Sequence, residues 1–248
     1  MQRLNSSKLL RSAQGFRQTK NCGAQIILAL DVDTIEEAQG LVDTLYPKIS
    51  IFKIGSHLFT AYGPKVIEMV HKKGAQVFLD LKYFDIPNTV AKAVAAAARQ
   101  KVEMLTLHIS GGKEMLEAAV ASVKEQAKVS KVSRPLLIGV TVLTSESAKP
   151  GAVLALARMG INCGLDGIVC SAREAAILRR KIKNEFFIIT PGIRPDDSIK
   201  DDQKRTATVS QAVKAGSNFL VIGRPILKAD NPLTAAEELL KDLPGTRG

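Results

Sequence analysis

The sequence predicts an α/β protein with the fold of a (β/α)8 TIM barrel, built as a single domain. Short apolar runs rich in β-branched residues alternate with longer amphipathic or alanine-rich stretches from residue 25 onward, which is typical of repeated βα units around a parallel sheet. Eight such units fit within residues 25–248, and no Pro-, Gly- or Ser-rich linker divides them. A doubly wound open sheet is the alternative, because periodicity does not reveal closure, but such a sheet would normally use fewer strands at this length.

The first four units supply four strands and four helices. The runs IILALD, ISIFKI, QVFLDL and MLTLHI are nearly continuous in apolar residues, as expected for parallel strands buried on both faces. They predict strands at 26–31, 49–54, 76–81 and 104–109, and the stretches that follow predict helices at 35–46, 58–73, 88–100 and 113–128. Pro87 suits the first turn of the third helix, because its φ is fixed near the helical value.

The last four units repeat this pattern. The runs LLIGVTVL, GIVC, FFIIT and NFLVI predict strands at 136–143, 167–170, 186–190 and 218–222. Helical patterns follow at 152–163, 172–183, 208–215 and 233–240. The longest connection without periodicity, at about 191–206, follows the seventh strand.

The composition argues against several classes of protein. With 46% hydrophobic and 24% charged residues, the chain resembles ordinary globular proteins. We find neither a membrane-spanning apolar run nor the continuous apolar core of a secretory signal. The three cysteines and three histidines lack metal-ligand spacing, and phosphate-loop and dinucleotide motifs are absent. We therefore expect a cytoplasmic protein with no metal, no membrane partner and no disulfide framework.

Positive charge is concentrated at the N-terminus. The formal net charge is +11, and residues 1–24 contain five basic and no acidic residues. We interpret them as a basic, solvated extension ahead of the barrel, although an organellar transit peptide has a similar composition. Such an excess suits an anionic partner. We do not expect nucleic acid, because aromatic residues make up only 4% of the chain and its basic residues are dispersed.

Polar residues lie at or just beyond the ends of most predicted strands. In a barrel of this kind the chemistry lies at the carboxyl ends of the strands, and here Asp and Lys alternate around the barrel mouth. The residues at these positions are Asp31, Lys53, Asp80 with Lys82 and Asp85, His108, Thr144, Arg194, and Gly223 with Arg224. Asp80 and Lys82 are two residues apart in one strand, so their side chains should point to the same side. A salt-bridged surface loop is the simplest alternative for this segment.

The motifs in these segments resemble those of the bacterial-type orotidine 5′-phosphate decarboxylase family, which carries out the last step of de novo UMP synthesis. The resemblance spans about residues 25 to 243, and its most informative motif is DLKYFDIPNT at 80–89. The other motifs follow in the family's order: LALD at 28–31, FKIG at 52–55, LH with GG at 107–112, VLTS at 142–145, TPGIR at 190–194, DQKR at 202–205 and IGRPI at 222–226.

The resemblance implies a role for each matching residue. Lys53, Asp80, Lys82 and Asp85 would form a catalytic Lys-Asp-Lys-Asp array, with Asp85 reaching into the partner's site of a homodimer. Lys53 would also contact the substrate, together with Asp31 and Thr89 at the ribose, Thr144 at the pyrimidine edge, Gln203 at the base and phosphate, and Arg194, Gly223 and Arg224 around the phosphate.

The implied reaction is the decarboxylation of orotidine 5′-monophosphate to UMP and CO2 without a cofactor. Loss of CO2 leaves negative charge on a pyrimidine carbon, which the site must stabilise or protonate. The ammonium group of Lys82 offers both a positive charge and a proton, so we expect it to be the proton donor.

Two alternatives use parts of the same pattern. Mg²⁺-dependent sugar-phosphate decarboxylases and hexulose-phosphate synthases also resemble the D-x-K-x-x-D string, but they have an acidic residue where this chain has Lys53, which would repel the metal. A non-catalytic nucleotide-binding barrel could retain Gly223 and Arg224. It would have no reason to keep four alternating charges, whose burial is costly unless they are paired.

Overall fold

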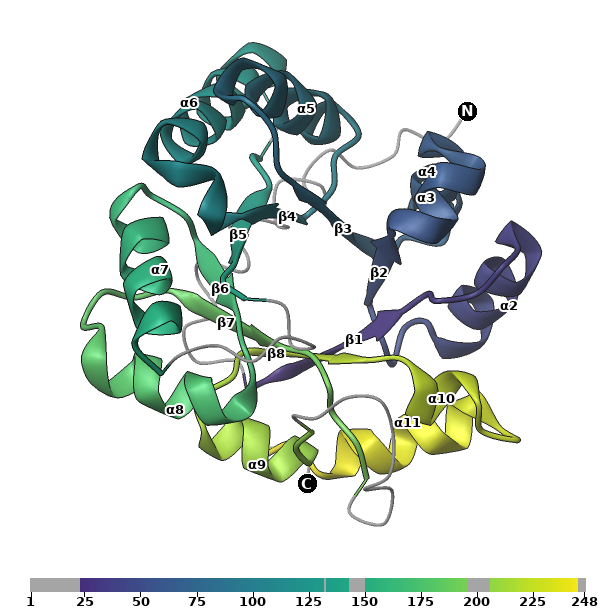
Figure 1. Ribbon diagram of the computed structural model, residues 1–248. Coiled ribbons are helices and arrows are strands. Elements are labelled where there is room, and N and C mark those ends of the chain that lie inside the picture. Colours follow the sequence, from purple (N-terminus) through teal and green to yellow (C-terminus); the bar gives the residue numbers. More distant parts are fainter. Residues whose placement is uncertain (1–22, 132, 143–149, 196–205, 245–248) are drawn as a thin grey trace.

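The eight parallel strands close into a barrel in chain order, with helices around the outside (Figure 1). The computed structural model describes residues 23–131, 133–142, 150–195 and 206–244. The strands are β1 (Gln25–Ala29), β2 (Ile51–Gly55), β3 (Gln76–Tyr83), β4 (Met104–His108), β5 (Leu136–Val140), β6 (Gly167–Val169), β7 (Phe187–Thr190) and β8 (Phe219–Ile222). β1 pairs with β8 in parallel, from Gln25 opposite Phe219 to Leu28 opposite Ile222. This pairing closes the sheet, so the open-sheet alternative is wrong.

The described part of the chain also contains ten helices and one 3₁₀ turn, which lie between the strands or follow the last one. They are α2 (Ile35–Leu45), α3 (Ser56–Tyr62), α4 (Pro64–Lys72), α5 (Pro87–Arg99), η2 (Ile109–Gly111), α6 (Gly112–Ser130), α7 (Pro150–Asn162), α8 (Ala172–Lys181), α9 (Val209–Lys214), α10 (Arg224–Leu227) and α11 (Pro232–Lys241). Capping boxes begin α2 at Thr34, α8 at Ser171 and α9 at Thr208. In each box, two backbone N–H groups that lack partners in the helix find side-chain acceptors.

The predicted helix 58–73 is wrong, because the structure has two helices there. α3 ends at Tyr62 and α4 begins at Pro64, with Gly63 between them at a φ of 58°. Glycine adopts this left-handed conformation without the steric cost of a Cβ atom. Pro64 has no N–H and fits the first turn of the second helix.

The barrel has two distinct apolar layers. The outer layer lies between the strands and the helices and includes Leu28, Phe52 and Leu79. The inner layer consists of buried residues from the strands alone: Ile27, Ala29, Ile51, Phe78, Met104, Leu136, Ile138, Ile189, Phe219 and Val221. Because side chains alternate along a strand, each strand serves both layers. The inner layer fills the middle of the barrel and forms the floor on which the site is built.

Some predicted features lie outside the described residues. These are Thr144, Gln203, residues 1–22 of the predicted extension 1–24 and the last residue of the predicted strand 136–143. Where the chain is described, none of its helices has the length and apolar character needed to span a bilayer.

Candidate active site

The site lies above the inner apolar layer, at the carboxyl ends of β1 to β4. Four of its inward-facing polar residues each follow an inner-layer residue by two positions. Asp31 follows Ala29, Lys53 follows Ile51, Asp80 follows Phe78 and Thr106 follows Met104. The strand period of two therefore directs all four side chains toward the barrel axis.

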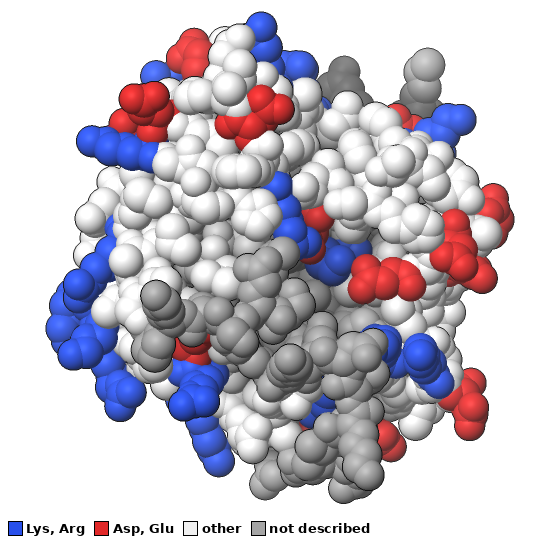
Figure 2. Space-filling view, viewed as in Figure 1, with Lys and Arg blue, Asp and Glu red and all other residues white. Residues whose placement is uncertain are grey.

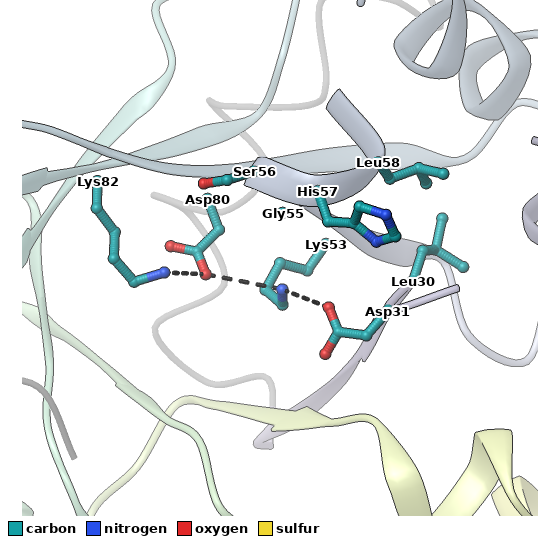
Figure 3. A pocket seen from close by; sticks show the side chains of 9 residues that line it. All are labelled: Leu30, Asp31, Lys53, Gly55, Ser56, His57, Leu58, Asp80 and Lys82. Carbon is teal, nitrogen blue, oxygen red and sulfur yellow. Dashed lines mark hydrogen bonds and ion pairs between the residues drawn. The ribbon is translucent and has the colours of Figure 1, made fainter. Parts of the chain in front are cut away.

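Four charged side chains form a continuous chain across this end of the barrel. Nζ of Lys53 lies 3.1 Å from Oδ1 of Asp31 and 3.7 Å from Oδ2 of Asp80. Nζ of Lys82 lies 2.9 Å from the same Oδ2 of Asp80. Figure 3 shows this line of contacts, in which two ammonium groups converge on one carboxylate oxygen. We call Asp31, Lys53, Asp80 and Lys82 the charged array.

Lys82 has a backbone conformation that its neighbours in the strand do not share. Its φ is 50°, in the left-handed region, which costs a non-glycine residue on the order of 1 kcal/mol. The ladder between β3 and β4 is irregular at this point, with a register shift between Leu79 and Tyr83. The strand therefore departs from ideal geometry at the residue predicted to donate a proton.

The charged neighbours of Asp80 determine its ionisation. Burial would raise the pKa of this carboxyl, but the ammonium groups of Lys53 and Lys82 and hydrogen bonds from Lys82 and Thr106 outweigh burial and lower its pKa below the usual value. Asp80 is therefore a carboxylate at neutral pH. A buried carboxylate of this kind is tolerated because it is paired and hydrogen-bonded.

A cavity of about 310 Å³ opens over the charged array. Its lining also includes Gly55 and the first residues of α3, Ser56 and His57. Gly55 leaves room for the ammonium group, because an added Cβ atom would lie 3.2 Å from Nζ of Lys53. In the view of Figure 2, basic and acidic side chains meet in a hollow near the centre of this face.

Sequence reasoning missed Thr106, Ser56 and His57. Thr106 donates a hydrogen bond to Oδ1 of Asp80 at 2.8 Å and accepts one from the backbone N–H of Lys82 at 2.9 Å. A threonine in an apolar strand carries no chemical signal of its own. Its position two residues after Met104, level with Asp80, was the one clue available.

Asp85 and Thr89 do not line the cavity of this single chain. Asp85 is exposed and accepts a hydrogen bond from the backbone N–H of Ile86 at 2.6 Å. Thr89 is exposed in the first turn of α5. The neighbours Phe84 and Ile86 expose 62% and 66% of their surfaces, which is unusual for apolar residues of this size.

The three predicted phosphate-binding residues follow β7 and β8. Arg194 is buried and donates a hydrogen bond to the backbone oxygen of Ile193 at 2.9 Å. Gly223 lies beside the charged array, since an added Cβ atom would be 3.5 Å from Oδ2 of Asp31. Arg224 begins α10. Neither arginine lines the cavity over the charged array.

The carboxylates of the charged array do not form a metal site. Asp31 and Asp80 both contact lysine ammonium groups, which oppose the approach of a divalent cation. Across the described ranges, no three or more His, Cys, Asp and Glu side chains are grouped so that they could hold a metal ion.

Fold and site together define a (β/α)8 barrel with a charged cavity at the carboxyl ends of its strands, where enzymes of this fold carry their active sites. The chain belongs to the orotidine 5′-phosphate decarboxylase / HUMPS family, whose model matches residues 24–239.

Individual relatives resemble the chain over almost the whole of their own lengths. A Coxiella burnetii protein named orotidine 5′-phosphate decarboxylase is 44% identical over 230 residues, covering 88% of this chain and 96% of that protein. A Vibrio cholerae protein of the same name is 45% identical and covers 88% and 98%. The crystal structure of orotidine 5′-phosphate decarboxylase from Lactobacillus acidophilus is similar with a TM-score of 0.78 and 34% identity, covering 88% of this chain and 98% of that one.

Proposed function

We propose that this protein decarboxylates orotidine 5′-monophosphate to UMP and CO2, the last step of de novo pyrimidine biosynthesis. The observation that carries the proposal is the charged array, in which Lys53 and Lys82 both approach Oδ2 of Asp80 in a cavity at the barrel mouth. Family membership and the relatives' names support the same reaction.

Lys82 is the proton donor in this proposal. The bond between the pyrimidine ring and the carboxylate breaks, and its electron pair stays on the ring carbon while CO2 departs. Lys82 then gives that carbon a proton and regains one from solvent. Its ammonium group stabilises the developing negative charge before it donates the proton.

Asp80 and Lys53 prepare the site for this step. Asp80 is held as a carboxylate beside the position of the substrate carboxylate, so repulsion between the two is relieved as CO2 leaves. Lys53 bridges Asp31 and Asp80, and this fixes the positions of both carboxylates before the substrate binds. Because these charges are already in place, the reaction needs little rearrangement and no metal or cofactor.

The remaining sequence-predicted residues bind the substrate. Asp31 and Thr89 contact the ribose, Thr144 contacts the pyrimidine edge, and Gln203 contacts both base and phosphate. Lys53 also contacts the substrate. Arg194, Gly223 and Arg224 receive the 5′-phosphate, since loops after the seventh and eighth strands commonly form the phosphate site of such barrels. The phosphate takes no part in the chemistry, but its binding energy can hold the base against Lys82.

The active form is a homodimer in which Asp85 enters the partner's site. Asp85 is exposed and does not line the cavity of its own chain, and the exposed Phe84 and Ile86 flank it. An apolar pair at a surface is typical of a protein interface. Burial of Phe84 and Ile86 against a second copy would carry Asp85 across the twofold axis.

We place the reaction in the cytoplasm. Cys163 and Cys170 are free, and free cysteines of this kind are typical of reducing compartments.

The deciding experiment measures the loss of orotidine 5′-monophosphate absorbance with purified protein, with and without EDTA. Turnover that EDTA does not change supports the proposal. Turnover that EDTA abolishes would contradict the cofactor-free mechanism, and a protein that neither turns over the substrate nor binds UMP would favour the Mg²⁺-dependent sugar-phosphate alternative. Binding of UMP without turnover would favour a non-catalytic nucleotide-binding barrel.

A further inference from the structure

Thr106 is a polar residue in the wall of the barrel, and no part of it is exposed to solvent. It lies on β4 between Leu105 and Leu107, and both of these residues pack into the outer apolar layer. A buried hydroxyl group needs hydrogen-bond partners, since burying it alone is costly. The partners of Thr106 belong to the charged array.

The two hydrogen bonds of Thr106 have fixed directions. The backbone N–H of Lys82 can only donate, so Oγ1 of Thr106 accepts from it at 2.9 Å. The carboxylate of Asp80 can only accept, so the single hydroxyl proton of Thr106 points to Oδ1 of Asp80 at 2.8 Å. The hydroxyl therefore connects Asp80 and Lys82 by a second route, separate from the ion pair between their side chains.

The register of the sheet explains why a side chain is needed here. Leu79 pairs with Leu105 and Tyr83 pairs with Leu107, so Thr106 alone lies opposite residues 80–82. The regular pairing between the backbones of β3 and β4 is interrupted along this segment. The hydroxyl of Thr106 gives the N–H of Lys82 an acceptor at the position where its φ is 50°.

The same hydroxyl determines how Asp80 presents its two oxygens. Oδ1 receives the proton of Thr106, while Oδ2 lies 2.9 Å from Nζ of Lys82 and 3.7 Å from Nζ of Lys53. If Oδ1 lost its partner, the carboxylate could rotate about its χ2 angle and weaken both ionic contacts.

We propose that Thr106 is a positioning residue for decarboxylation, which holds the Asp80 carboxylate and the backbone of Lys82 in the geometry that the reaction requires. The inference rests on the proposed function for its effect on turnover. Thr106 acts through Asp80 and Lys82 and does not touch the reacting atoms.

The test compares substitutions that separate the hydroxyl from the shape of the side chain. Thr106→Val keeps the branched shape and removes the hydroxyl, whereas Thr106→Ser keeps the hydroxyl. Thr106→Ala is a second variant without the hydroxyl. Thr190→Val is the matched control, because it removes another buried threonine hydroxyl, which forms a hydrogen bond with Oγ of Ser217 at 2.6 Å.

We expect kcat to fall about 10- to 100-fold in Thr106→Val, because a small displacement of catalytic groups has an effect of this size. UMP affinity should change less than threefold, and Thr106→Ser should recover most of the turnover. Thr190→Val should lower thermal stability without a comparable loss of kcat. A kcat within twofold of wild type in folded Thr106→Val or Thr106→Ala would overturn the proposal. If neither variant folds, Thr106 is required for the fold and the positioning role is wrong.

A second readout does not depend on turnover. The carboxyl carbon of Asp80 can be titrated by NMR, and its pKa should be higher in Thr106→Val than in wild type or Thr106→Ser, because one hydrogen bond to the carboxylate is lost. Unchanged titration of Asp80 would contradict the positioning role. If wild type fails to decarboxylate orotidine 5′-monophosphate but the NMR shift is present, the proposed function fails while the structural role of Thr106 stands.

Discussion

Nζ of Lys82 lies 2.9 Å from Oδ2 of Asp80, although only Leu81 separates the two residues along β3. In a regular strand, residues two apart are separated by about 6.6 Å along the chain and their side chains run parallel. Here Lys82 has a left-handed backbone with a φ of 50°, and its long side chain extends back to Asp80. The strand thus brings a carboxylate and an ammonium into contact within three residues, and the first prediction concerns that ammonium.

Replacing Lys82 with alanine should reduce turnover at least about 1000-fold while UMP binding persists in weakened form. The substitution removes a charge and a proton that are needed chiefly in the transition state. Steady-state kinetics and UMP titration measure the two effects separately. Lys92→Ala, which changes an exposed lysine on α5, is the control. Turnover within tenfold of wild type would reject Lys82 as the proton donor.

Mixing Lys82→Ala with Asp85→Ala should restore activity that neither variant has alone. If Asp85 acts in the partner's site, each mixed dimer has one site with both lesions and one with neither. Equal mixing with full subunit exchange should therefore yield about a quarter of wild-type activity. Exchange is followed with differently labelled subunits. An inactive mixture despite demonstrated exchange would show that the sites are not shared.

Replacing Arg224 with alanine should raise KM strongly for orotidine 5′-monophosphate and change activity toward orotidine far less. Arginine binds phosphate through charge-assisted hydrogen bonds, and the nucleoside lacks the phosphate. The comparison requires kcat/KM for both substrates in both proteins, with Arg180→Ala on the exposed face of α8 as the control. Equal proportional losses for the two substrates would exclude a phosphate role.

Replacing Gly55 with alanine should lower kcat/KM about tenfold with little change in stability, because small displacements of charged groups in a site have effects of this size. The backbone at Gly55 has a φ of −90°, which alanine tolerates, but its Cβ atom would lie 3.2 Å from Nζ of Lys53. The ammonium group must then shift relative to Asp31 and Asp80.

Gly40→Ala on α2 is the matched control for this substitution, because its added Cβ atom meets nothing within 4 Å. It should leave kcat/KM unchanged. Full activity of Gly55→Ala would mean that the position of Lys53 is not critical.

The stability of the protein should fall between about pH 4.5 and pH 7 because of Glu103. Burial raises the pKa of Glu103 from 4.5 to about 7, although a hydrogen bond from the backbone N–H of Val77 opposes part of the shift. Because the pKa of Glu103 is higher in the folded than in the unfolded state, the contribution of Glu103 to stability is complete below pH 4.5. This contribution is lost as the pH rises through 7. Glu103→Gln keeps an acceptor for Val77 and removes this titration.

The measurement is the free energy of unfolding in urea at pH 5 and pH 8. From pH 5 to pH 8, the free energy of unfolding of Glu103→Gln should rise relative to that of wild type by on the order of 2 to 3 kcal/mol. His71, whose Nε2 lies 4.0 Å from Oε2 of Glu103, has a pKa lowered by burial and by Lys101. The contribution of His71 to stability has the opposite pH dependence, because it is lost as the pH falls.

Glu125→Gln on the exposed face of α6 is the control. Equal stability differences at the two pH values would reject the prediction.

The order of the strands could be predicted because each is a short apolar run followed by a helical pattern. The sequence also indicated that Asp31, Lys53, Asp80 and Lys82 would lie at one end of the barrel, since strand ends in a parallel sheet share an edge. The break at Gly63 was missed because the apolar pattern continues through it, although a Gly-Pro pair is a local signal for a break.

The internal geometry of the site could not be predicted in the same way. The left-handed backbone of Lys82 depends on the register between β3 and β4, which is a property of two segments and not of either one. The role of Thr106 depends on the same register. Asp85 and Thr89 lie away from the cavity of their own chain, and the role predicted for Asp85 requires a second subunit, whose position the sequence of one chain does not specify.

The alternation of signs in the charged array affects how far its electric field extends. Asp31, Lys53, Asp80 and Lys82 cancel as two opposite pairs, so their combined potential falls off with distance faster than that of a single charge. The array therefore acts strongly on a ligand in contact with it and only weakly on one still in solution. Long-range attraction of an anion must come from the rest of the chain, whose formal charge is +11. Added salt should consequently slow the encounter with a phosphorylated ligand while leaving the chemical step of the bound complex nearly unchanged.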